Sequence, residues 1–170
     1  MKSQHRSIKT LAILLPFSWM LLACKPPVSG ESTGWKYPIL QFQLARQNLS
    51  TQLPMPVKGI TSAQINDTWG AARGQNRKHE GIDIFAKRGT EVLSTTQGIV
   101  AKVGLDSLGG KVVWVVGPDL SRHYYAHLEA YVPHLDVGDW IERGSVLGYV
   151  GNTGNAKNTP PHLHYGIYFT

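Results

Sequence analysis

The sequence has almost no cysteine, because Cys24 is the only one among its 170 residues. An intramolecular disulfide is therefore excluded. Zinc sites made of four cysteines, or of two cysteines and two histidines, are excluded as well. Any metal that this chain holds must be bound by histidine, aspartate or glutamate.

Long apolar runs and clustered basic residues are also scarce. The main apolar stretch, Leu11 to Ala23, is interrupted by Pro16 and Ser18 and is shorter than a membrane-spanning helix requires. The net charge of +6 favours anionic partners. No arginine-rich run or repeated basic–aromatic pattern accompanies that charge, so we expect no nucleic-acid partner.

Residues 1–23 have the pattern of an export signal, with a positively charged start followed by the apolar stretch. The stretch ends in Leu21-Leu22-Ala23-Cys24, which resembles the lipobox of bacterial lipoproteins. That resemblance implies that Cys24 is lipidated and becomes the mature N-terminus. Lys25, the next residue, implies release to the outer membrane, so we expect a lipid-anchored protein of the cell envelope that faces the periplasm. The alternative is an ordinary signal peptide with an incidental cysteine.

The rest of the chain divides into a tether and a domain. Residues 24–52 begin with the proline, glycine and serine content of a flexible linker. Apolar residues between 38 and 49 fit either a short helix or a strand packed on the domain. Residues 53–170 show short β-branched runs separated by turn residues about every ten positions, which predicts a small all-β sandwich or barrel. The expected strands are 57–60, 81–85, 91–93, 98–103, 112–116, 122–128, 140–141, 146–150 and 162–169.

His162-Leu163-His164 lies within the last of these strands. Side chains alternate along a strand, so both imidazoles face one side while Leu163 faces a core. Neutral imidazole is a common zinc ligand. An isolated pair of this kind is more often a surface or hydrogen-bonded pair, so a metal site requires a third ligand from elsewhere in the chain.

His79 and Asp83 are the candidates for the ligands that the pair lacks. Being four residues apart, they share a face on a strand or a helix. Gly81 and the neighbouring isoleucines favour a strand, in which Glu80 points away from the metal. In the alternative, a helix similar to the His-Glu-x-x-His segment of zinc proteases, Glu80 would be the general base.

Two histidines and one carboxylate leave one position open on a tetrahedral zinc ion, which is typical of catalytic sites. His79, Asp83 and one member of the His162/His164 pair suffice as ligands, and the other member remains as a proton-handling group. A further proton-handling group is expected from the predicted strand 122–128. There His123, Tyr125 and His127 would share a face, and spacing alone does not choose between the two histidines.

Four motifs together resemble the M23 peptidases, the lysostaphin/LytM-type zinc endopeptidases of bacterial cell walls. In chain order the motifs are His79-x₃-Asp83, Tyr125-Ala126-His127-Leu128, Gly148-x₂-Gly151-x-Thr153-Gly154 and His162-Leu163-His164. The resemblance as a whole covers about Leu53 to Phe169. The resemblance implies an antiparallel β-sheet with a groove and one zinc ion bound by His79, Asp83 and His164. It assigns His127 and His162 to orient the attacking water and stabilise the oxyanion.

The implied function is hydrolysis of peptide cross-links in bacterial peptidoglycan during cell-wall remodelling. Stem peptides are the expected substrate, the bond between D-alanine and diaminopimelate is the expected target, and division or cell-wall proteins are expected partners. Trp69, Arg73, Trp114 and Tyr165 are expected along the groove. The main alternative is a catalytically silent regulator that activates cell-wall amidases. A lipoyl-type carrier hairpin at Gly138–Gly144 is disfavoured, because it lacks the modified lysine.

Overall fold

The computed structural model describes residues 36–73 and 77–169. The predicted signal peptide and Cys24 lie outside the described residues, and the boundary predicted at Leu53 stays a prediction. None of the helices within the described ranges is long and apolar enough to cross a membrane.

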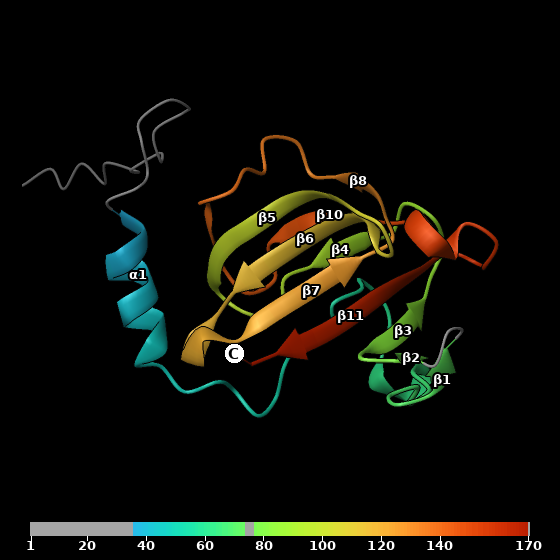
Figure 1. Ribbon diagram of the computed structural model, residues 1–170, viewed down its shortest axis with the longest axis horizontal. Helices are drawn as coiled ribbons and strands as arrows, with labels where there is room; N and C mark the ends of the chain where they lie inside the picture. The colour runs from blue at the N-terminus through green and yellow to red at the C-terminus, as the bar shows by residue number, and fades with distance from the viewer. Residues whose placement is uncertain (1–35, 74–76, 170) are drawn as a thin grey trace, which may run out of the picture. The chain divides into compact units, whose positions relative to one another are not determined.

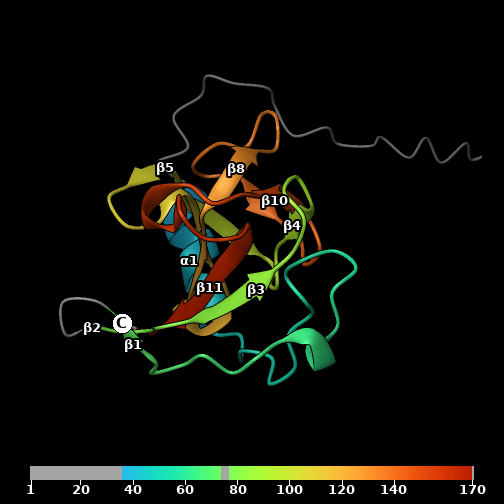
Figure 2. The same cartoon turned by 90° about the vertical axis from the view of Figure 1, so that its right-hand side faces the viewer.

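The main sheet contains six antiparallel strands in the order β3-β11-β7-β6-β5-β9, and it curls along its length (Figure 1). Long β-branched and aromatic runs form its centre, as strand preferences predict. The pairing places β3 and β11 side by side at one edge, where Figure 2 views them. The strands are β3 (Ile82–Phe85), β5 (Gly98–Asp106), β6 (Gly110–Val116), β7 (Arg122–Ala126), β9 (Trp140–Ile141) and β11 (His162–Tyr168).

A second, smaller antiparallel sheet has the order β4-β10-β8. Its strands are β4 (Glu91–Leu93), β8 (Leu128–Tyr131) and β10 (Val146–Val150). One hydrophobic core draws side chains from both sheets, including Val92, Val113, Leu147 and Leu163. The predicted all-β, antiparallel fold is therefore confirmed.

The two faces of the main sheet differ in character. On β11, Leu163 and Tyr165 belong to the hydrophobic core, while His162 and His164 occupy the alternate positions. On β7, Tyr124 and Ala126 form a separate small cluster with Val112. Period-two alternation thus sends one set of side chains into the core and leaves the other set to build a functional face.

The shorter elements differ from the expected ones. Residues 36–45 form a helix, α1 (Lys36–Ala45), which resolves the alternative left open between 38 and 49. Pro38 is compatible with it because the amides of a helix's first turn have no intrahelical acceptor. Leu44 is fully buried. A short 3₁₀ turn, η2 (Ser62–Gln64), follows.

The first expected strand, 57–60, is reduced to an isolated bridge between Val57 and Val92. Pro56 lacks an amide hydrogen for a longer ladder, and Gly59 turns the chain with a φ of 77°. Ahead of β3, two short strands that were not among the expected ones, β1 (Ala72–Arg73) and β2 (Arg77–Lys78), pair as a small antiparallel hairpin.

Candidate metal centre and catalytic groove

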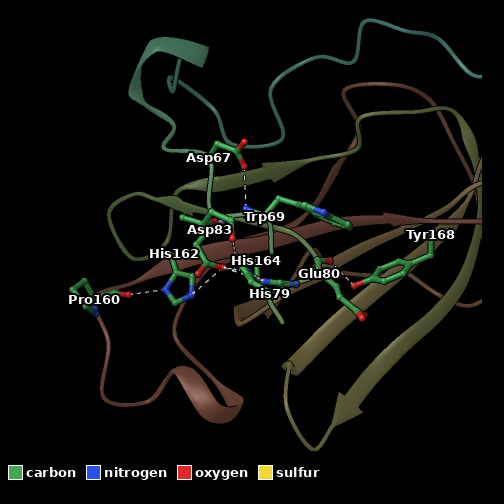
Figure 3. A network of polar contacts seen from close by, with 10 residues as sticks. Asp67, Trp69, His79, Glu80, Asp83, Pro160, His162, His164 and Tyr168 are labelled. Carbon is green, nitrogen blue, oxygen red and sulfur yellow. Dashed lines mark hydrogen bonds and ion pairs between the residues drawn. The ribbon is translucent and has the colours of Figure 1, made fainter. Parts of the chain in front are cut away.

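His79, Asp83 and His164 come together at the edge of the main sheet. Asp83 lies on β3 directly opposite His164 on β11, and His79 precedes β3. His79 Nε2 is 2.9 Å from His164 Nδ1, and Asp83 Oδ1 is 3.0 Å from each of these two nitrogens. Figure 3 shows the three side chains pointing toward one another. The structure therefore brings His79 and Asp83, the candidate ligands predicted from the sequence, into contact with His164, one of the two C-terminal histidines.

The chemistry of these atoms fits a zinc ion. Two imidazoles and a carboxylate are ordinary zinc ligands, and tetrahedral bonds of ~2.0–2.1 Å separate ligand atoms by roughly 3.3 Å. His79 Nδ1 lies 2.8 Å from the carbonyl oxygen of Thr68. Since a carbonyl only accepts, Nδ1 carries the proton and donates it, so Nε2, which lies beside Asp83 and His164, is the ring nitrogen with a lone pair for a metal.

His162 and His127 lie beside this cluster. His162 Nε2 is 3.9 Å from Asp83 Oδ1, further than the corresponding distance for His164. The ring centroids of His127 and His162 are 5.0 Å apart, and those of His127 and His164 are 5.9 Å apart. The two candidate proton-handling histidines therefore lie next to each other and next to the candidate metal centre.

Both of these histidines are held in a defined tautomer. His127 Nδ1 is 2.9 Å from the Thr153 carbonyl oxygen, and His162 Nδ1 is 2.9 Å from the Pro160 carbonyl oxygen. Each Nδ1 must donate, so each neutral ring keeps Nε2 as an acceptor. Burial, with the neighbouring His162 as a further cause, lowers the pKa of His127 to about 4. His127 is therefore neutral at neutral pH.

The expectation that His123, Tyr125 and His127 share a strand face is correct for His123 and Tyr125, which both face the core, and wrong for His127. His123 is fully buried, and its Nδ1 lies 2.8 Å from the hydroxyl of Tyr165 in the core. His127 has a left-handed φ of 63° between the ends of β7 and β8. Alternation stops at that residue, so the His127 ring turns to the groove instead of following Tyr125 into the core.

Gly81 is a site residue that the sequence prediction used only as a helix breaker. A β-carbon at this position would lie 2.8 Å from His164 Cε1 and 2.6 Å from the Tyr165 carbonyl oxygen. The His164 ring therefore occupies space that only glycine leaves open. The strand interpretation of this segment is confirmed by β3, and the exposed Glu80 lies outside any helix.

A groove of about 940 Å³ extends from the histidines along the sheet. Its floor is aromatic, since the ring of Trp114 lies 4.4 Å from Tyr124 and 5.5 Å from Tyr168 between centroids. Of the four residues expected along the groove from the sequence, Trp114 does line it. Tyr165 faces the core and Trp69 is exposed outside the lining. The side chain of Arg73 lies outside the described part of the chain.

The chain matches the model of peptidase family M23 over residues 77–170. It is 39% identical over 122 residues to the L-Ala–D-Glu endopeptidase of Bacillus subtilis, covering 68% of this chain and 37% of that protein. It is 33% identical over 89 residues to the glycyl-glycine endopeptidase ALE-1 of Staphylococcus capitis, covering 51% of this chain and 24% of that one. It thus spans less than two fifths of either relative.

Solved structures agree with these sequence matches. The catalytic domain of lysostaphin from Staphylococcus simulans superposes with a TM-score of 0.56 at 29% identity, covering 62% of this chain and 82% of that domain. More than half of the chain is matched by the family model, and the matched residues include the whole groove lining. On these grounds the chain is a member of peptidase family M23.

Proposed function

We propose that this protein is a zinc-dependent endopeptidase that hydrolyses peptides of bacterial peptidoglycan. The observation that carries the proposal is the convergence of His79 Nε2, Asp83 Oδ1 and His164 Nδ1 within 3.0 Å, beside two histidines of fixed tautomer. His79, Asp83 and His164 would hold the metal. Zinc bound there supplies Lewis acidity and lowers the pKa of a coordinated water toward neutrality.

His127 and His162 perform the proton handling in this proposal. With Nδ1 donating to a backbone carbonyl, each ring offers an Nε2 lone pair that can accept a hydrogen bond or a proton from the attacking water. Once protonated, the same nitrogen can donate to the developing oxyanion. Hydrolysis adds the water oxygen to the carbonyl carbon, breaks the carbon–nitrogen bond and delivers a proton to the leaving amine.

The substrate class follows from the family and from the groove. Both curated relatives described above are named as endopeptidases, but one name specifies an L-Ala–D-Glu bond and the other a glycyl-glycine bond. We propose a peptidoglycan stem peptide or cross-link as the substrate and keep the bond between D-alanine and diaminopimelate as the predicted target. The aromatic floor offers apolar surface for the peptide beside the histidines.

The test is hydrolysis of purified cross-linked peptidoglycan by the zinc-loaded protein, with mass analysis of the released fragments. We expect new peptide termini at one type of bond, loss of activity with a chelator, and neither bound zinc nor activity in His79→Ala. A zinc-loaded protein that releases no fragments would overturn the proposal. In that case a silent regulator of amidases, which the complete set of ligands disfavours, becomes the better hypothesis.

We also propose that Cys24 anchors the protein to the outer membrane. The proposal rests on the lipobox-like sequence alone. Metabolic labelling with a fatty acid should mark the wild-type protein and leave Cys24→Ser unlabelled. Equal labelling, or none in either, would contradict the anchor.

A further inference from the structure

One connection in the fold holds both proton-handling histidines. Residues 151–161 join β10 to β11 and include the short turn η4 (Gly154–Ala156). The carbonyl of Thr153, near its start, accepts from His127 Nδ1. The carbonyl of Pro160, near its end, accepts from His162 Nδ1 (Figure 3). The relative position of the two rings therefore depends on how the two ends of this connection are fixed to each other.

The first end is fixed to the sheets through the Thr153 side chain. Its hydroxyl donates to the Leu128 carbonyl at 2.9 Å and accepts from the Lys111 amide at 2.9 Å. These two bonds tie the residue that holds His127 to the starts of β8 and β6. The acceptor for His127 is thus anchored independently of the rest of the connection.

The second end is joined to the first by Asn152. Its Nδ2 lies 3.2 Å from the carbonyl oxygens of both Lys157 and Thr159. Its Oδ1 accepts from Arg88 Nη2 at 2.6 Å. The orientation of the amide is unambiguous, because a guanidinium only donates and the two carbonyls only accept. Asn152 is next to Thr153 in the sequence, and Thr159 is next to Pro160. The hydrogen bond from Asn152 to the Thr159 carbonyl therefore links the neighbourhoods of the two carbonyls, of Thr153 and Pro160, that accept from the histidines.

We propose that Asn152 is a positioning residue that keeps the Pro160 carbonyl in place and thereby fixes the tautomer and orientation of His162. Asn152 is neither a candidate metal ligand nor a groove-lining residue itself; of the residues whose carbonyls it holds, Thr159 lines the groove. Its catalytic consequence rests on the proposed function, in which His162 needs a proton-free Nε2 directed at the reacting water. Its structural consequence, the tautomer of His162, does not depend on catalysis.

The test compares Asn152→Asp with Asn158→Asp in the full, zinc-loaded protein. The first variant still accepts from Arg88 but cannot donate to the carbonyls of Lys157 and Thr159. The second makes the same charge change at an exposed position of the same connection. We expect Asn152→Asp to lower kcat about tenfold or more, since small displacements of catalytic groups are costly. In Asn152→Asp, KM and zinc content should stay within about twofold of wild type. In Asn158→Asp, the activity should also stay within about twofold of wild type.

A second readout is the tautomer itself, measured from the ¹⁵N chemical shifts of the imidazoles. His162 should be protonated at Nδ1 in the wild type and a mixture of tautomers in Asn152→Asp, while His127 keeps its tautomer through Thr153. Asn152→Ala, which adds no charge, should give the same result. An unchanged His162 tautomer in both variants would overturn the proposal. A wild type that shows the expected tautomers but no hydrolysis would instead refute the proposed function.

Discussion

His162 and His164 lie on the same face of β11, yet they relate differently to Asp83. The nearest ring nitrogen of His164 is 3.0 Å from Asp83 Oδ1, whereas that of His162 is 3.9 Å away. His162 is held instead by the Pro160 carbonyl. The two histidines share one face of β11, but His164 contacts the candidate metal ligand Asp83 whereas His162 is bonded to a backbone carbonyl.

Substitution of each histidine should separate these tasks. We expect His164→Ala to weaken zinc binding by more than the ~10–100-fold that loss of a supporting residue costs, because a ligand itself is removed. His162→Ala should keep most of its zinc and lose ~10²–10⁴-fold in kcat, the usual contribution of a proton-handling group. Metal analysis and steady-state kinetics measure both effects. Equal loss of zinc in the two variants would contradict the assignment.

Residue spacing was enough to predict the β11 part of the site. Alternation along a strand places His162 and His164 on one side, and the structure confirms that Leu163 is in the core. The four-residue spacing of His79 and Asp83 likewise predicted that they would point the same way. The alternation along β11 is local to one strand, whereas His79 precedes β3 and approaches Asp83 from outside the strand.

Other parts of the site could not be predicted from spacing. His127 reaches the groove only because its own backbone leaves the strand conformation. Histidine adopts a left-handed φ more often than most residues, but such residues are uncommon, so the residue type alone does not identify the position. The groups that hold the rings are backbone carbonyls of Thr68, Thr153 and Pro160, and every residue type has such a carbonyl. Long-range pairing, which sequence alone does not determine, brings them to the histidines.

Gly81→Ala tests whether the space beside His164 must stay empty. The added methyl would lie 2.8 Å from two atoms of the imidazole and 2.6 Å from the Tyr165 carbonyl oxygen, so the His164 ring or the adjoining backbone of β11 must shift and disturb the contact with Asp83. We expect zinc affinity to fall by ~10–100-fold, as for other losses of ligand orientation. Gly104→Ala is the matched control, because a β-carbon there would meet nothing within 4 Å. Isothermal titration with zinc compares the two, and equal affinities would refute the steric argument.

His123 should make the fold sensitive to acid. Burial lowers its pKa from 6.5 to about 4. Between these values the unfolded chain binds a proton that the folded chain does not, so the stabilisation is complete above pH 6.5 and decreases as the pH falls toward 4. The loss for this residue amounts to about 3 kcal/mol at pH 4. Burial raises the pKa of its neighbours Tyr125 and Tyr165, so neither titrates in this range.

Urea unfolding of wild type and His123→Gln at pH 7 and pH 4 measures this contribution. The variant should show a smaller decrease in the free energy of unfolding between the two pH values, by about 3 kcal/mol. His134→Gln, at an exposed histidine, should keep the decrease of the wild type. If His123→Gln also kept it, burial of His123 would not be the cause of acid sensitivity.

Tyr124→Phe tests the link between the aromatic floor and His127. The Tyr124 hydroxyl donates to Asp106 Oδ2 at 2.7 Å, and Asp106 Oδ1 accepts from the Gly109 amide. The Gly109 carbonyl in turn accepts from the His127 amide at 2.8 Å. Loss of a hydrogen bond to a charged group should lower the free energy of unfolding by about 2 kcal/mol, as measured with urea. It should also lower kcat, because the loop that holds the His127 backbone loosens.

Tyr149→Phe is the control for this prediction. The Tyr149 hydroxyl has no hydrogen bond within the described chain, so this variant should change neither the free energy of unfolding nor kcat. Equal stability of the two variants would show that Asp106 holds the loop without Tyr124.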